Sequence, residues 1–125
     1  MTIFCAFLSS GILAQIVKHI YNSPRPKFYF GNTEDQYFIK GIDFAFNNSF
    51  PSGHTATAFA VATVLVLNLQ NKKLQLPLLF AALLVAFSRI YLGQHFLLDV
   101  LVGAFIGVVC GIGCVYFFWK SKKAK

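Results

Sequence analysis

Residues 95–119, HFLLDVLVGAFIGVVCGIGCVYFFW, give the clearest indication of how this chain folds. This stretch is almost entirely apolar, and as an α-helix it is long enough to cross a hydrocarbon layer about 30 Å thick, which takes roughly 20 residues. It ends at Trp119, where basic residues follow at once, and such an aromatic and basic boundary is typical of the membrane–water interface. The stretch therefore predicts a membrane-spanning helix from about His95 to Trp119.

Three further apolar segments precede this helix. They run from about Thr2 to Ile20, from Gly53 to Leu69 and from Leu76 to Leu92, and each is near the length that one span needs. The first is diluted by serine, glycine and glutamine, so we expect it to be the weakest span. Gly93 follows the third segment and offers a helix stop. The sequence therefore predicts an all-α transmembrane bundle of four spans, with residues 1–125 forming one membrane-embedded domain.

The composition excludes an ordinary soluble domain. The chain has 125 residues, of which 57% are hydrophobic and 12% are charged, and its mean hydropathy is +0.64, so lipid is the expected solvent. The net charge of +7 does not indicate nucleic acid, because the basic residues form short clusters beside apolar segments and no single aromatic-interleaved surface. The three cysteines lie inside apolar segments without a zinc-like spacing, so we interpret them as packing residues.

Charge clusters predict the topology. Lys72, Lys73 and the basic tail of residues 120–125 are expected on the cytoplasmic side, because positive charge in short loops tends to stay there. Residues 21–50, which carry most of the acidic residues and many aromatics, then form an outer-side loop with room for a short interfacial helix. No basic region precedes the first apolar segment, so we expect it to be kept as a span and not cleaved as a signal peptide.

Gly103, Gly107 and Gly111, the glycine stripe, recur at every fourth residue of the last span. Because they lack side chains, another helix can approach closely, so we expect a packing surface here and no catalytic role. Its partner is open at this stage. The stripe could contact one of the chain's own spans, spans absent from the chain or a second subunit, so helix-mediated self-association stays an alternative.

Ionisable and hydroxyl side chains gather at the outer ends of all four spans. A single basic residue at a span boundary is usually an anchor that reaches the lipid headgroups. Here every span contributes, and the residues fall at one level of the membrane. They are Lys18 and Arg25, then Ser52 and His54, then Arg89, then His95 and Asp99.

His95 and Asp99 are four residues apart, so on a helix they share a face and can approach within hydrogen-bond range. A carboxylate that accepts the Nδ1–H fixes the imidazole tautomer and leaves the Nε2 lone pair free for attack. Residues 51–54, Pro-Ser-Gly-His, open a helix whose free N–H groups suit a phosphate, although a plain turn and N-cap is an alternative interpretation. A turn at Gly93 is expected to bring Arg89 beside His95.

Lys18 and Arg25 complete the chemistry of a phosphate site. Lysine supplies a point charge and arginine a planar fork of donors, and both suit phosphate oxygens. A transferring phosphoryl group needs positive charge on its equatorial oxygens, a nucleophile on one side and a proton donor on the other. The sequence has each of these parts, which favours phosphoryl transfer.

These residues resemble the three-part signature of the type 2 phosphatidic acid phosphatase superfamily, which also includes the glucose-6-phosphatases and the vanadium haloperoxidases. The resemblance extends from about Lys18 to Val109. The first part reads Lys18, six residues, Arg25-Pro26; the second reads Pro51-Ser52-Gly53-His54; the third reads Ser88-Arg89, five residues, His95, three residues, Asp99.

The resemblance implies a membrane phosphatase that hydrolyses a lipid phosphate or diphosphate through a phosphohistidine, without a metal or other cofactor. It implies that His95 is the nucleophile, that Asp99 orients it and that His54 is the acid that protonates the leaving oxygen. The implied phosphate ligands are Lys18, Arg25, Ser52, Gly53 and Arg89. The expected partners are the lipid substrate and membrane lipids, with no nucleic acid.

The chain departs from the family in one respect. Membrane members usually have six spans, whereas only about 17 residues precede Lys18, so the first two spans of the family core are expected to be missing. The chain is then an excerpt, a form that starts late or a natural four-span form. The alternative to an enzyme is a catalytically silent scaffold or lipid-binding remnant of the same fold. The joint presence of His54, His95 and Asp99 favours the enzyme, and long apolar spans disfavour a soluble haloperoxidase.

The substrate stays open. Phosphatidic acid, phosphatidylglycerol phosphate, undecaprenyl diphosphate and lipid A phosphates all fit a site at the membrane boundary, because the headgroup can enter while the tail remains in lipid. The expected location is the bacterial inner membrane, with the active site on the outer face.

Overall fold

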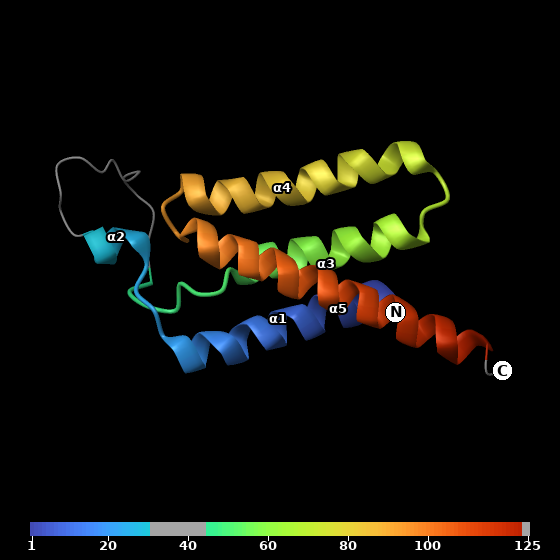
Figure 1. Ribbon diagram of the computed structural model, residues 1–125, viewed down its shortest axis with the longest axis horizontal. Helices are drawn as coiled ribbons and strands as arrows, with labels where there is room; N and C mark the ends of the chain where they lie inside the picture. The colour runs from blue at the N-terminus through green and yellow to red at the C-terminus, as the bar shows by residue number, and fades with distance from the viewer. Residues whose placement is uncertain (31–44, 124–125) are drawn as a thin grey trace.

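The computed structural model describes residues 1–30 and 45–123 of the chain. The regular secondary structure of this part is helical, and the helices form one bundle (Figure 1). In chain order they are α1 (Thr2–Tyr21), α2 (Pro26–Phe30), α3 (Gly53–Asn68), the 3₁₀ turn η1 (Lys72–Leu74), α4 (Gln75–Tyr91) and α5 (Leu97–Lys123). The four long helices correspond to the four predicted segments, so the predicted all-α bundle is confirmed.

Length and composition make this a membrane bundle. Thr2–Phe30, Lys72–Tyr91 and Leu97–Ser121 are long and apolar enough to cross a membrane, whereas α3 is apolar but shorter. By length the weakest of the four is therefore α3, and not the N-terminal segment singled out from the sequence. Large apolar side chains face outward, such as Phe105 with 70% of its surface exposed. Lipid accommodates such a surface, which water would not.

α3 lies at the centre of the bundle, because it packs against α1, α4 and α5. Figure 1 shows α4 along one side of α3 and α1 along the other, with α5 crossing α3 and α1. The C-terminal ends of α1 and α4 and the N-terminal ends of α3 and α5 lie together at the left of this view. The helix ends that the sequence predicted to face the outer side thus lie together at one end of the bundle.

Local backbone chemistry explains most of the helix ends. α1 stops at Asn22, which adopts the left-handed conformation with a φ of 37° and donates its N–H to the Lys18 carbonyl at 2.9 Å. Gly93 has a φ of 65°, which confirms the predicted turn after α4. α2 is the short helix that the sequence left room for in the segment 21–50. The rest of that segment, residues 31–44, lies outside the described residues.

The start of α5 differs from the expectation. The helix begins at Leu97, so His95 lies in the turn before it and not on the helix. The reason is local, since the Phe96 N–H bonds to the Asp99 carboxylate at 2.9 Å. Phe96 is the N-cap residue and Asp99 is the third residue of the helix, so this bond is one of the two hydrogen bonds of a capping box. α5 also continues past Trp119 to Lys123.

The glycine stripe faces α3 of the same chain, which confirms the predicted packing role. A Cβ added at Gly103 would lie 2.5 Å from the Ser52 carbonyl oxygen. One added at Gly107 would overlap the carbonyl oxygen of Ala56 and lie 2.9 Å from the Ala60 nitrogen. Ala56 and Ala60 are themselves fully buried. Small residues on both helices let the backbones approach, so van der Waals contact holds α3 to α5 in lipid.

Gly107→Ala is expected to lower the melting temperature of the detergent-solubilised protein, because the added methyl group meets the backbone of α3. Overpacking of this kind costs about 1–3 kcal/mol. Gly113→Ala is the matched control, since a Cβ added there has nothing within 4 Å, and alanine should be neutral or stabilising in a helix. Circular dichroism melting curves compare the two variants with wild type. Equal midpoints for both variants would contradict the close α3–α5 packing.

Candidate active site

The predicted site residues meet at the shared end of the bundle. Lys18 lies in the last turn of α1 and Arg89 in the last turn of α4. Arg25 precedes α2, and His54 lies at the beginning of α3. His95 lies in the turn before α5, and Asp99 lies in the first turn of that helix. Lys18, Arg25, Arg89 and His95 all interact electrostatically with His54, and Lys18 and Arg25 also interact with Asp99. Three cations, two histidines and one carboxylate thus form one cluster.

A tight turn brings Arg89 next to His95. Gly93 supplies the left-handed conformation, and the Arg89 carbonyl accepts hydrogen bonds from the N–H groups of Gln94 at 3.1 Å and His95 at 3.3 Å. The Arg89 guanidinium is oriented by Gln94 Oε1 at 3.1 Å and by the Ser88 hydroxyl at 3.2 Å. The predicted role of the glycine, which is to let residues of α4 and of the next segment face one site, is therefore realised.

His95 and Asp99 form a buried pair without a direct hydrogen bond. Nδ1 of His95 lies 3.6 Å from Asp99 Oδ2, and the two residues are 3% and 4% exposed. The separation is within ion-pair contact but beyond hydrogen-bond range, and Nδ1 has no hydrogen-bond partner in the described part of the chain. The expected hydrogen bond is therefore not formed, because His95 lies in the turn before α5 and not on the helix.

Ser49 supplies one of those donors. Its hydroxyl donates to Asp99 Oδ2 at 2.5 Å, and its side chain is fully buried. The second donor is the Phe96 N–H. The sequence analysis did not include Ser49 among the site residues, because no spacing rule links a serine ahead of α3 to an aspartate fifty residues later. Only the packing of the two segments reveals the contact.

Ser52 and Gly53 have different roles at the start of α3, where the sequence left an N-cap and a phosphate site as alternatives. Ser52 is fully buried and acts as the N-cap of α3, because its hydroxyl oxygen accepts hydrogen bonds from the Thr55 hydroxyl at 2.9 Å and the Thr55 N–H at 3.4 Å. Its own N–H donates to the Asp99 carbonyl at 2.9 Å. A Cβ at Gly53 would have nothing within 4 Å, so the space beside the α3 N-terminus is open.

Arg25 has a donor that is ready for an anion. Its Nε is buried and lacks a hydrogen-bond partner in the part of the chain that the structure describes, and buried polar groups are normally paired. The Arg25 N–H bonds to the carbonyl of Phe46 at 3.3 Å, which holds this residue against the segment that leads to α3. The backbone of Arg25 is thus held in place, and a guanidinium with a free donor suits a phosphate oxygen.

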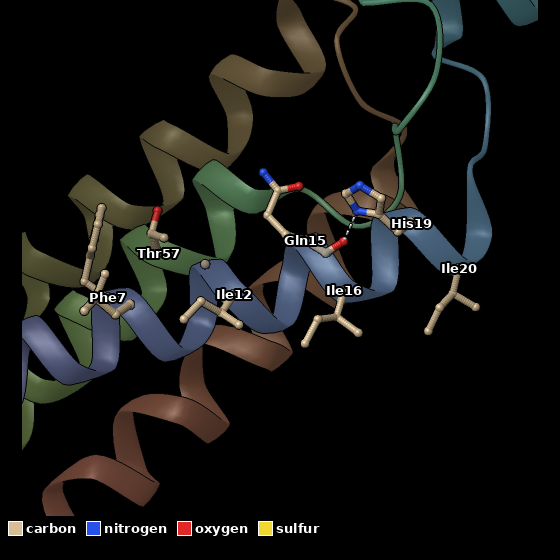
Figure 2. A pocket seen from close by; sticks show the side chains of 9 residues that line it. Phe7, Ile12, Gln15, Ile16, His19, Ile20 and Thr57 are labelled. Atoms are coloured by element: carbon tan, nitrogen blue, oxygen red, sulfur yellow. Dashed lines mark hydrogen bonds between the residues drawn. The ribbon is translucent and has the colours of Figure 1, made fainter.

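Apolar grooves adjoin this charged cluster. A hollow of about 380 Å³ is lined by Lys18, Gly53 and His54 together with residues of α1. It shares Phe7 and Thr57 with a larger hollow of about 660 Å³ along α1, shown in Figure 2. In that view Ile12, Ile16 and Ile20 of α1 line the hollow, and Nδ1 of His19 donates to the Gln15 carbonyl at 2.9 Å. A third groove, about 420 Å³, begins at His54 and runs between α3 and α4.

Metal ligands are scarce in the described residues. Within residues 1–30 and 45–123, no three His, Cys, Asp or Glu side chains gather where they could hold a metal ion. The cluster is dominated by cations, which suit an anionic group better than a metal ion. Metal independence itself stays a prediction that an assay has to test.

Known proteins resemble this chain over most of its length. The family model described as the PAP2 superfamily matches residues 1–123. The bacitracin transport permease protein BcrC of Bacillus licheniformis is 32% identical over 94% of this chain and 53% of its own length. Undecaprenyl-diphosphatase BcrC of Bacillus subtilis (strain 168) is 31% identical over 80% of this chain and 48% of its own length.

The fold also matches a solved structure. The crystal structure of Aquifex aeolicus LpxE superposes with a TM-score of 0.77 at 37% identity, covering 92% of this chain and 66% of that one. This chain spans about half the length of the two curated relatives. The family match over nearly the whole chain, together with the fold, establishes that the chain belongs to the PAP2 superfamily.

Proposed function

We propose that this protein is a membrane phosphatase that hydrolyses a lipid phosphate or diphosphate through a phosphohistidine on His95, without a metal. One observation carries the proposal, namely that two histidines, a buried carboxylate and three cations converge at one end of a membrane bundle. The name of the Bacillus subtilis relative, undecaprenyl-diphosphatase, supports the same reaction class.

Lys18, Arg25 and Arg89 would bind the phosphoryl oxygens. The electrostatic interactions of all three with His54 support this arrangement, and the unpaired Nε of Arg25 provides a donor. The open space beside Gly53 gives an oxygen access to the N-terminus of α3, where the helix dipole and free N–H groups favour an anion. Ser52 caps α3 and so shapes this cradle, and it stays among the proposed phosphate ligands.

In the first step, Nε2 of His95 attacks phosphorus. The P–N bond forms as the bond from phosphorus to the leaving oxygen breaks, and His54 donates a proton to that oxygen. Asp99 stabilises the positive charge that develops on the His95 ring. The cations offset the negative charge of the equatorial oxygens, and their partial burial makes this interaction stronger than it would be in water.

In the second step, water attacks the phosphohistidine. Neutral His54, having lost its proton, accepts one from the water, the P–N bond breaks, and its electron pair returns to Nε2 of His95. Inorganic phosphate leaves and the original protonation states are restored. The same histidine thus serves as acid and then as base, which is the simplest cycle that the cluster permits.

The surroundings of the cluster favour an amphiphilic substrate. The apolar grooves along α1 and between α3 and α4 begin beside Lys18 and His54, so a headgroup could bind at the cluster while its tail stays in lipid. Lys72 and Lys73 lie in η1, just before α4, and Lys120 lies near the C-terminus of α5. These positions are at the end of the bundle opposite the cluster, and positive charge favours the cytoplasmic side. We therefore propose a site on the outer face of a bacterial inner membrane.

His95→Ala is expected to lower phosphate release from a lipid substrate by at least about a thousandfold, because the substitution removes the nucleophile. The assay uses detergent-solubilised protein with EDTA, and compares phosphatidic acid with undecaprenyl diphosphate. Tyr116→Ala is the control, since Tyr116 is 61% exposed in the C-terminal part of α5, away from the cluster at the other end of this helix. No release from folded wild type would favour a silent scaffold, and loss of activity in EDTA would contradict metal independence.

His54→Ala is expected to lose much less activity on p-nitrophenyl phosphate than on a lipid phosphate. Nitrophenolate leaves without a proton, whereas a lipid alkoxide needs one, and general acid catalysis contributes roughly 10²- to 10⁴-fold. Steady-state kcat/KM values for both substrates, in wild type and variant, give the comparison, because kcat/KM covers the steps up to release of the leaving group and not the later hydrolysis in which His54 acts as the base. An equal loss on the two substrates would exclude His54 as the leaving-group acid.

A further inference from the structure

Ser49 stands out because it is a fully buried polar residue in a connecting segment. Its hydroxyl donates to Asp99 Oδ2 at 2.5 Å, and its N–H donates to the Ser23 carbonyl at 3.0 Å. The neighbouring Phe50 N–H bonds to the Ser23 hydroxyl at 3.1 Å. Ser49 is thus fixed on one side by its backbone and on the other by a carboxylate, so its position is tightly defined.

The orientation of the Asp99 carboxylate depends on this hydroxyl. Oδ2 accepts hydrogen bonds from Ser49 and from the Phe96 N–H, the latter at 2.9 Å, and the same oxygen lies 3.6 Å from His95 Nδ1. Two donors from different segments therefore hold Oδ2 on the side that faces the imidazole. The Phe96 N–H alone would hold the carboxylate at one point only, and so would constrain its side-chain torsions less than the two donors do together.

Cations compete for the same carboxylate. Lys18 and Arg25 both interact electrostatically with Asp99. A carboxylate without its serine donor would gain by turning toward them, because opposite charges attract strongly when partly buried. Such a turn would take Asp99 away from His95 and would neutralise a cation that the phosphate needs.

We propose that Ser49 is a positioning residue that keeps the Asp99 carboxylate directed at Nδ1 of His95 and away from the phosphate-binding cations. The proposal rests on the proposed function. Ser49 does not touch the substrate. It acts through Asp99, which then favours the His95 tautomer that carries its proton on Nδ1 and leaves Nε2 free to attack phosphorus.

Ser49→Ala is expected to lower kcat by about tenfold or more while KM changes less than about twofold, because small misplacements of catalytic groups are costly. Ser49→Thr, which keeps a hydroxyl, is expected to recover most of the activity. Ser23→Ala is the matched control, because it removes a hydrogen bond to the same segment without touching Asp99. It should lower thermal stability but leave kcat within about twofold of wild type.

A second measurement does not depend on turnover or on the threonine variant. The ¹⁵N spectrum of protein with labelled histidine reports which ring nitrogen carries the proton, and the His95 signals are identified by their absence in His95→Ala. Wild type and Ser23→Ala are expected to show His95 mainly as the Nδ1–H tautomer. Ser49→Ala is expected to show a mixture of tautomers.

The two measurements separate this inference from the proposed function. Wild-type activity with an unchanged kcat in Ser49→Ala, or a His95 spectrum that is the same in wild type and Ser49→Ala, would overturn the role of Ser49 and leave the phosphatase standing. Folded but inactive wild type would overturn the phosphatase, and the spectra alone would then decide whether Ser49 sets the tautomer. Equal kcat losses in Ser23→Ala and Ser49→Ala would reduce Ser49 to a structural residue.

Discussion

Two hydrogen bonds hold residues 49–52 against the first turn of α5. One runs from the Ser49 hydroxyl to the Asp99 carboxylate at 2.5 Å, and the other from the Ser52 N–H to the Asp99 carbonyl at 2.9 Å. The approach is close because Gly103 leaves room for the Ser52 carbonyl. Unpaired backbone groups cost several kcal/mol in lipid, so this contact has few alternatives. It fixes the beginning of α3, and with it His54, relative to Asp99.

Much of this architecture follows from local sequence rules. Apolar length predicted the four helices, the glycine stripe predicted a close helix contact, and Gly93 predicted the turn that brings Arg89 to His95. These predictions succeeded because hydropathy and glycine conformation act over a few residues, whatever the rest of the chain does. The spacing of the signature residues likewise indicated that they would gather, since each falls at the end of a helix and the helices alternate in direction.

Contacts between distant segments could not be predicted in this way. The helical spacing of His95 and Asp99 suggested a hydrogen bond, but the Asp99 carboxylate caps the helix through the Phe96 N–H and leaves His95 in the preceding turn. No sequence pattern marked Ser49 as a site residue, because its contact with Asp99 forms only when the segment before α3 packs against α5. For Ser52 the sequence allowed two roles, an N-cap or a phosphate ligand. The structure shows that Ser52 is the N-cap of α3.

The alternating direction of the helices also explains the charge pattern of the site. Four antiparallel helices place two C-terminal and two N-terminal ends at one face of the membrane. Lys18 and Arg89 lie in the last turns of α1 and α4, where the helix dipole favours cations, and Asp99 lies in the first turn of α5, where it favours an anion. The N-terminus of α3, beside Gly53, is the remaining positive end. Because no acidic residue lies in the first turn of α3, that end is left for an anion that comes from outside the chain, which is what the proposed function requires of a phosphate site.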